Sequence, residues 1–338
     1  MTRSPSNEGN AVTTAADPDA PVVVLERPYP SANAVLIRGN GAILVDPGFG
    51  SDVDSLLTWL RATGVQPDAL ELVVNTHYHS DHVGANHALQ KRFGRRIATH
   101  DIDAALINRR AQSACAAEWL RQPVESYTVD RPLHDGDTLD TGASRWTVLH
   151  TPGHTDGHAS LYDARSRILI GGDVVHATDL GWLNPYTESA DSLETSLDSL
   201  RRLEALSPRL VISGHGPVIT EPLAAFERAR LRLERWQSDP EAMAWHAAKR
   251  IFAYALMIED GIADGDVASY LDTSPWVHDV AAQPFGMTAA EWTPVLLDEM
   301  LRSGAAAWSD GRLVARAPHA APPRGWARTP TTPSRWGD

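Results

Sequence analysis

The amino-acid sequence predicts an α/β fold followed by a mainly helical region. Over residues 21–220, short apolar runs of strand length alternate with amphipathic helical patterns, and from about residue 221 long helical patterns dominate. Hydrophobic residues make up 43% and charged residues 22% of the 338 residues, as in ordinary globular proteins. The chain is therefore long enough for one large α/β domain and a smaller appendage.

The first strands are expected to form antiparallel hairpins. The apolar runs 21–25, 34–37 and 42–45 are joined by Gly- and Asn-rich turns. An amphipathic helix is expected over 52–63, and the run 72–74 then leads into a cluster of histidines. Similar patterns predict strands at 97–99, 146–150, 160–162, 168–170 and 210–213, and helices at about 82–93 and 191–206.

The region 221–316 is expected to form a separate, winged-helix-like domain. Helical patterns cover 222–236, 241–257 and 288–302. Asp310-Gly311 is a hairpin-turn signal between two short apolar runs. Helices followed by a hairpin are the basis of this prediction.

Both ends of the chain are expected to be disordered. Residues 1–20 are mostly small and polar, and residues 317–338 are rich in Pro and Arg, so neither segment has much to bury. The N-terminal segment has no apolar core of a signal peptide, and no later run reaches the ~20 apolar residues of a membrane span. A cytoplasmic protein without a membrane partner is expected.

Charge and cysteine content limit the kinds of site that the chain can build. Its formal net charge of −13 repels polyanions, so DNA is not an expected partner. Cys115 is the single cysteine, which excludes an internal disulfide and a thiolate zinc finger. A metal ion would have to be held by His and carboxylate side chains.

The sequence His77-Tyr78-His79-Ser80-Asp81-His82 is the strongest candidate for a metal site. His77 and His79 are two residues apart, so on an extended segment they lie on one side and can bind the same ion. Asp81 and His82 would belong to a second ion close by. Paired ions roughly 3.5 to 4 Å apart are typical of hydrolytic metal sites.

Three more ligand-type residues follow apolar runs on glycine-containing loops. His154 ends Thr151-Pro152-Gly153-His154 and would complete the first ion's three histidines. Asp173 follows two glycines and could bridge the two ions, and His215, between Gly214 and Gly216, would complete the second. A solvated polar loop would not produce this recurrence, so five histidines and two aspartates are predicted as ligands of two Zn²⁺ ions, with Fe or Mn as substitutes.

The pattern HxHxDH, TPGH, GD and GHG resembles that of the metallo-β-lactamase superfamily, especially its glyoxalase II-like branch, over about residues 22–220. The resemblance implies a four-layer αβ/βα sandwich with the active site at the edge between two mixed sheets. It assigns His77, His79 and His154 to the first metal, Asp81, His82 and His215 to the second, and Asp173 to both. Asp46, in Val45-Asp46-Pro47-Gly48, matches the aspartate that supports the site without binding metal.

A hydroxide formed between two metal ions is the expected nucleophile, since the chain has no GxSxG motif for a serine nucleophile. The expected substrate is a small thioester, ester or lactone, and Asp81 is expected to accept or relay a proton. The loop 176–186 is the expected pocket wall, with His176, Trp182 and Tyr186 as candidate substrate contacts. The alternative for the two aromatic residues is that they only pin this loop.

Other functions remain open. Asp81 at the second metal departs from the antibiotic-degrading enzymes, which commonly have a cysteine there, so lactamase activity is not expected. A single-strand endoribonuclease or phosphodiesterase, a mononuclear iron dioxygenase of the persulfide type and a metal-stabilised binding protein are the alternatives. Residues 240–316 contain eleven acidic and five basic residues, so this region is expected to cap the active site or to form a homodimer interface rather than to read DNA.

Overall fold

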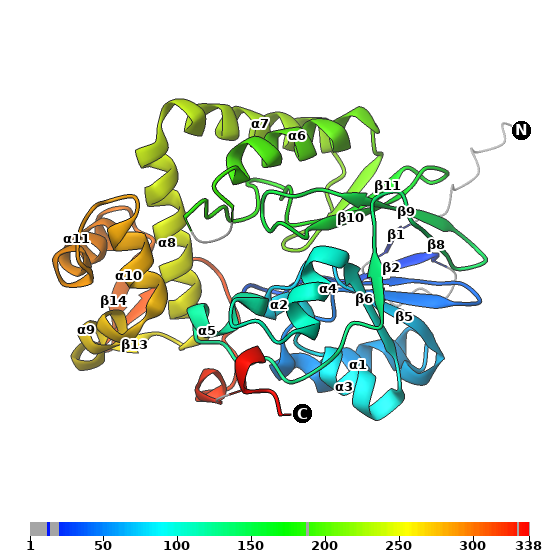
Figure 1. The fold of residues 1–338 in the computed structure, drawn as a ribbon, viewed down its shortest axis with the longest axis horizontal. Helices are drawn as coiled ribbons and strands as arrows, with labels where there is room; N and C mark the ends of the chain where they lie inside the picture. The colour runs from blue at the N-terminus through cyan, green and yellow to red at the C-terminus, as the bar shows by residue number, and fades with distance from the viewer. Residues whose placement is uncertain (1–11, 14–19, 187–188, 330, 338) are drawn as a thin grey trace, which may run out of the picture.

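The computed structural model contains two mixed β-sheets and a smaller third sheet in the C-terminal region (Figure 1). It describes residues 12–13, 20–186, 189–329 and 331–337.

The first large sheet has the strand order β1-β2-β3-β4-β5-β6-β7. β2, β3 and β4 pair antiparallel, as the turns between them predict, whereas β4 to β7 pair parallel. The strands are β1 (Val12–Thr13), β2 (Val22–Leu25), β3 (Ala34–Ile37), β4 (Ala42–Val45), β5 (Leu70–Val74), β6 (Arg96–His100) and β7 (Arg131–Leu133).

The second large sheet has the order β12-β11-β10-β9-β8. β11 and β12 are parallel, and the other pairs are antiparallel. The strands are β8 (Thr138–Asp140), β9 (Arg145–His150), β10 (Ala159–Asp163), β11 (Ile168–Gly172) and β12 (Leu210–Ser213).

Helices cover the outer faces of the two sheets (Figure 1). Because side chains alternate along a strand, Leu44 and Val73 pack toward the helices, while Val45 and Val74 pack between the sheets against Trp146. The four-layer αβ/βα sandwich is thereby confirmed. The helices of this part are α1 (Val53–Ala62), α2 (Ser80–Val83), α3 (Asn86–Phe93), α4 (Asp101–Asn108), α5 (Ala117–Leu120), α6 (Ser192–Ala205) and α7 (Pro222–Ser238).

The helix predicted over 82–93 is wrong in its extent. The structure has two helices, α2 and α3, on either side of Gly84-Ala85. A Cβ at Gly84 would lie 2.1 Å from the backbone nitrogen of Gly50 and 2.4 Å from the carbonyl carbon of Phe49. The chain therefore packs backbone against backbone at this glycine, which the helical periodicity could not reveal.

The C-terminal region contains helices and the predicted hairpin. Its elements are α8 (Pro240–Ile258), β13 (Ile262–Ala263), α9 (Asp264–Thr273), α10 (Pro275–Ala282), α11 (Ala289–Arg302), β14 (Ala306–Ser309) and β15 (Arg312–Ala315). The third sheet has the order β13-β15-β14, and β14 and β15 pair antiparallel. The winged-helix interpretation of this arrangement stays a prediction.

Helix α7 belongs structurally with the sandwich. Phe226 and Leu233 of α7 share a buried core with Leu200 of α6, and α7 runs beside α6 in Figure 1. The domain boundary expected after residue 220 therefore falls between two helices that pack on each other.

The prediction that residues 317–338 are disordered is wrong for the part that the structure describes. Trp336 is 7% exposed, and its indole nitrogen donates to the carbonyl oxygen of Val124 at 2.7 Å. The amide of Val124 donates to Thr331. One buried indole can anchor a Pro- and Arg-rich segment that lacks any hydrophobic periodicity.

The same prediction for residues 1–20 falls mostly outside the described residues. Val12–Thr13 form β1 beside β2, and Ala20 is buried, so disorder is wrong at these positions because the edge of β2 offers backbone partners.

In the part of the chain that the structure describes, no helix combines the length and the apolar composition needed to cross a membrane.

Candidate metal centre

The predicted ligands meet at one edge of the sandwich because each follows the end of a strand. Residues 77–82 follow β5, His154 follows β9, Asp173 follows β11 and His215 follows β12. All seven predicted ligands are buried, with at most 7% of each residue exposed. Loops leaving one rigid edge can bring side chains together that lie more than a hundred residues apart in sequence.

Three imidazole nitrogens form a tight triangle. His77 Nε2 lies 3.0 Å from His79 Nδ1, His79 Nδ1 lies 2.9 Å from His154 Nε2, and His154 Nε2 lies 3.0 Å from His77 Nε2. Each neutral ring offers either a proton or a lone pair at that nitrogen, so at least one of the three pairs must join two donors or two acceptors. Hydrogen bonding cannot satisfy this arrangement, whereas one cation can accept all three lone pairs.

The spacing of the triangle suits zinc. A tetrahedral zinc ion with nitrogen ligands at about 2.0–2.1 Å places them roughly 3.3 Å apart. The observed separations of 2.9–3.0 Å are close to this value. His77, His79 and His154 could therefore hold one ion.

A second group lies beside the first. Asp81, His82 and His215 could hold another ion. His215 Nε2 is 3.1 Å from Asp81 Oδ2, and His82 Nε2 is 3.7 Å from the same oxygen. His82 Nε2 is buried and has no hydrogen-bond partner among the described residues, as expected of a nitrogen kept for a metal.

Asp173 lies between the two groups. Its Oδ2 is 3.6 Å from His154 Nε2 and 3.7 Å from His215 Nε2, and its Oδ1 is 3.7 Å from His82 Nε2. The geometry fits the predicted bridging position.

Asp46 supports the site from behind, as the resemblance implies. Its carboxylate accepts hydrogen bonds from the Thr76 amide at 2.8 Å, from Thr76 Oγ1 at 2.7 Å and from His82 Nδ1 at 2.9 Å. Thr76 Oγ1 in turn accepts from His77 Nδ1 at 3.1 Å. These contacts direct Nε2 of both rings into the site.

Two further contacts fix the site, and neither was predicted. His154 Nδ1 donates to the carbonyl oxygen of Trp182 at 2.5 Å, which holds His154 in the same tautomer. His158 is buried, and its Nε2 accepts from the amide of Asp173 at 3.0 Å. His158 follows Gly157 but precedes β10 and does not follow a strand, so the sequence did not distinguish it from an ordinary core histidine.

Burial sets the charge states of the first group. Burial, together with the neighbouring imidazoles, lowers the pKa of His77 and of His154 well below the usual value. Both rings are neutral at pH 7, which is the form that binds metal. Burial also lowers the pKa of His82, but three carboxylates, Asp46 first among them, raise it to about 10.

The carboxylates are ionised. Burial alone would raise the pKa of Asp81, but His82 and His215 more than offset this and hold it below the usual value. The same histidines hold the pKa of Asp173 well below its usual range. Two ionised carboxylates, those of Asp81 and Asp173, therefore face the site.

A glycine allows the close approach of the second group. A Cβ at Gly214 would lie 2.2 Å from Asp173 Oδ1 and 2.7 Å from the Cε1 atom of His82. No other residue fits at Gly214 without displacing these side chains.

The metal centre opens into a cavity of about 840 Å³. His176 and Trp182 line it, and Tyr186 is not among the described residues that do. Their role as substrate contacts stays a prediction. Trp182 also holds the loop to α8, because its indole nitrogen donates to the carbonyl oxygen of Ala247 at 3.1 Å. Cavity-lining residues that the sequence did not indicate are Tyr29, Asp179, Arg232, His246, Lys249, Arg250, Tyr254 and Arg316.

Asp179 ties the loop after the metal centre to the helices α7 and α8. It contacts Arg232, accepts from Arg250 Nη1 at 2.6 Å and lies 3.7 Å from His246 Nε2. Burial would raise the pKa of Asp179, but His246 and Arg250 hold it well below the usual range. Residues of α7 and α8 thus form one wall of the cavity, while the role of the C-terminal region as a cap or a dimer interface stays a prediction.

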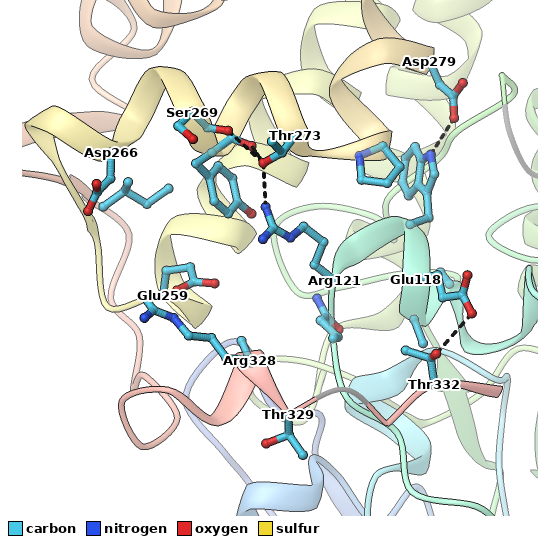
Figure 2. Close-up of a pocket in the computed structure, with 18 of the residues that line it drawn as sticks. Glu118, Arg121, Glu259, Asp266, Ser269, Thr273, Asp279, Arg328, Thr329 and Thr332 are labelled. Carbon is cyan, nitrogen blue, oxygen red and sulfur yellow. Dashed lines mark hydrogen bonds between the residues drawn. The ribbon is translucent and has the colours of Figure 1, made fainter. Parts of the chain in front are cut away.

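A second cleft, of about 1340 Å³, lies where α5, α9, α10 and the tail meet. Figure 2 shows Arg121 reaching Thr273 and Thr332 of the tail reaching Glu118, with distances of 3.2 and 3.1 Å. The described lining contains no histidine. These contacts join the tail and the C-terminal region to the sandwich, and the metal centre lies elsewhere.

Comparison with known proteins gives consistent matches. The sequence model of the metallo-beta-lactamase superfamily matches residues 28–215. An acyl-coenzyme A thioesterase, MBLAC2, of Gallus gallus is 31% identical over 219 residues, covering 57% of this chain and 76% of that protein. A hydroxyacylglutathione hydrolase of Cereibacter sphaeroides is 33% identical over 185 residues, covering 53% of this chain and 63% of that protein.

Among solved structures, a metallo-beta-lactamase family protein from Thermus thermophilus has the same fold. The TM-score is 0.53 and the identity 24%, and the match covers 88% of this chain and 99% of that one.

Proposed function

We propose that this chain, which belongs to the metallo-beta-lactamase superfamily of hydrolases, cleaves acyl thioesters of an anionic thiol carrier. The observation that carries the proposal is a buried cluster of metal-ligand type that opens into a cavity with apolar walls and a cationic rim. The names of two relatives fit it, because acyl-coenzyme A and hydroxyacylglutathione are both thioesters of anionic carriers.

In this proposal His77, His79 and His154 would hold one ion, Asp81, His82 and His215 would hold a second, and the carboxylate of Asp173 would be available to both. Zinc suits this donor set, and Fe or Mn are alternatives. When bound, such ions lower the pKa of a water molecule and polarise a carbonyl group.

The chain's own residues supply positioning and proton transfer. Asp81 is ionised, and we assign its carboxylate as the acceptor of a proton from the attacking water. The reaction adds water across the C–S bond, so that the acyl group leaves as a carboxylic acid and the carrier as a thiol.

The walls of the cavity suit an apolar acyl group. Leu120, Trp182, Ile251 and Met257 line it, and apolar contact of this kind binds acyl chains without directional requirements.

The rim of the cavity suits an anion. Arg232, Lys249, Arg250 and Arg316 line it in a chain whose net charge is −13. Asp179 neutralises part of this charge and Glu299 pairs with Lys249 at 2.9 Å, while Arg316 is exposed. A phosphate or carboxylate of the carrier would find a local positive field there.

The test is a substrate panel with detection of the released thiol. Zinc-loaded protein is assayed on short- and long-chain acyl-CoA, S-acylglutathione, esters, lactones and single-stranded RNA. Asp173→Ala and His79→Ala should abolish thioester hydrolysis while the protein stays folded. Activity retained by both variants would refute the site assignment.

Arg316→Glu tests the carrier. It should raise KM about tenfold for acyl-CoA and leave KM unchanged for the uncharged N-acetylcysteamine thioester of the same acid. Equal effects on both substrates would argue against a charged carrier. RNA cleavage without thioesterase activity, or one iron per chain with oxygen consumption, would favour the endoribonuclease or the dioxygenase instead.

A further inference from the structure

We propose that Tyr29 donates a hydrogen bond to the carbonyl oxygen of the substrate during hydrolysis and that Arg250 is its positioning residue. The proposal rests on the thioester hydrolysis proposed above. It concerns two residues far apart in the sequence, one before β3 and one in the middle of α8, that meet in the cavity beside the metal centre.

The ring of Tyr29 is fixed against the site. It stacks on His215 with a centroid separation of 4.2 Å and an angle of 18° between the planes. Its backbone carbonyl accepts from the amide of Ala320 in the tail at 2.7 Å. The phenol therefore has little freedom to leave the cavity that it lines.

The hydroxyl of Tyr29 is oriented by a cation. Arg250 Nη2 donates to the phenolic oxygen at 3.1 Å, while Arg250 Nη1 is held by Asp179 at 2.6 Å. The guanidinium of Arg250 donates to the phenolic oxygen, so the hydroxyl proton of Tyr29 remains available to another acceptor. Among the described residues, none accepts that proton.

A substrate carbonyl is the fitting acceptor. As water adds to a thioester carbonyl, the electron pair of the C=O bond moves to oxygen, and the charge there is stabilised by donors already in place. A hydroxyl that accepts from a guanidinium is a stronger donor, because hydrogen bonds in a chain polarise one another. The phenol of a tyrosine carries its proton at neutral pH, because its ordinary pKa is about 10.

The second tyrosine of the cavity, Tyr254, is not oriented in this way. Ser80 and Gln122 lie beside its hydroxyl, and among the described residues no arginine or lysine donates to it. Tyr186, a candidate substrate contact in the sequence analysis, is not among the described residues that line the cavity.

The experiment compares Tyr29→Phe with Tyr186→Phe. Phe keeps the ring that stacks on His215 and removes only the hydroxyl. For Tyr29→Phe we expect kcat for an acyl thioester to fall roughly 10²-fold, the usual effect of losing one such donor, with KM and the Kd of a nonhydrolysable thioether analogue changed less than threefold. Tyr186→Phe should keep the wild-type kcat.

A double-mutant cycle tests the positioning role. Introduced alone, Arg250→Lys should lower kcat. Added to Tyr29→Phe, it should lower kcat at most twofold further, because Arg250 acts through the hydroxyl that Tyr29→Phe has already removed. Additive losses would overturn the positioning role of Arg250.

Each remaining outcome is decisive. Unchanged kcat in Tyr29→Phe, or a rise in KM alone, would overturn the donor role while leaving thioester hydrolysis intact. A wild-type protein without thioesterase activity would overturn the proposed function and this inference with it.

Discussion

Replacing Asp46 by Asn should weaken metal binding without unfolding the protein. Asn is nearly isosteric and tolerates the left-handed backbone at this position, where φ is 51°. The carboxylate accepts three hydrogen bonds, two from Thr76 and one from His82. An amide oxygen cannot replace both carboxylate oxygens, and its NH₂ group would face a donor.

The expected magnitude follows from these contacts. Losing one hydrogen bond to a charged group inside a protein costs about 1.5–3 kcal/mol. His82 would also lose the carboxylate that holds a proton on its Nδ1 atom. Its Nε2 atom would then be less consistently available to a metal ion. Together these changes predict a loss of about 10- to 100-fold in metal affinity, the usual range for an outer support of a ligand.

The assay is a zinc titration against a chromogenic chelator, with thermal unfolding of the metal-free protein in parallel. Asp163→Asn is the matched control, because Asp163 is also buried and accepts from the amides of Arg165 and Ser166, at 3.0 and 3.3 Å, away from the site. Asp163→Asn should lower stability and leave zinc affinity unchanged. Wild-type zinc affinity in Asp46→Asn, or an equal loss in both variants, would refute the reasoning.

Three further variants test the packing and the electrostatics. Gly214→Ala should abolish activity and lower metal content measured by mass spectrometry, because its Cβ would meet Asp173 Oδ1 at 2.2 Å; full metal occupancy would contradict this. Trp336→Ala should lower the free energy of unfolding by about 3–5 kcal/mol in a urea titration, since it removes a buried indole, and an effect below 1 kcal/mol would show that the tail is not anchored. Burial, and then the neighbouring imidazole of His150, lower the pKa of His100 in the folded protein to about 4. In the unfolded chain this histidine is protonated below pH ~6.5, whereas in the folded protein it is protonated only near pH 4. Stability should therefore fall by at most about 3 kcal/mol as pH drops through this window, and His100→Gln should remove that part of the slope in urea titrations at each pH.

The strands and the ligand loops could be predicted because their signals are local. A buried strand is a short apolar run, and a ligand loop at its end needs a particular residue with glycine beside it where backbone approaches closely. Gly214 is an example of such a glycine. It stands beside the predicted ligand His215, and a Cβ at this position would collide with the carboxylate of Asp173. The resemblance then supplied the layer order that periodicity alone does not give.

The helix break at Gly84 and the ordered tail could not be predicted in this way. Both depend on a partner elsewhere in the chain, the backbone of Phe49-Gly50 for the glycine and the carbonyl of Val124 for Trp336. The low apolar content of residues 317–338 predicts that the segment buries little surface on average. The burial of the single side chain of Trp336 is enough to order the segment despite this composition.

By itself the sequence determined which histidines and aspartates are candidate metal ligands, because their spacing and their flanking glycines are properties of the chain as written. Only the tertiary structure decided what surrounds that set. Tyr29 and Arg250 are separated by more than two hundred residues and carry no motif, yet Arg250 Nη2 lies 3.1 Å from the phenolic oxygen. The contact between Tyr29 and Arg250 depends on how the C-terminal helices pack on the sandwich. That packing is determined by apolar and charged side chains far apart in the sequence, so no local sequence pattern predicts it.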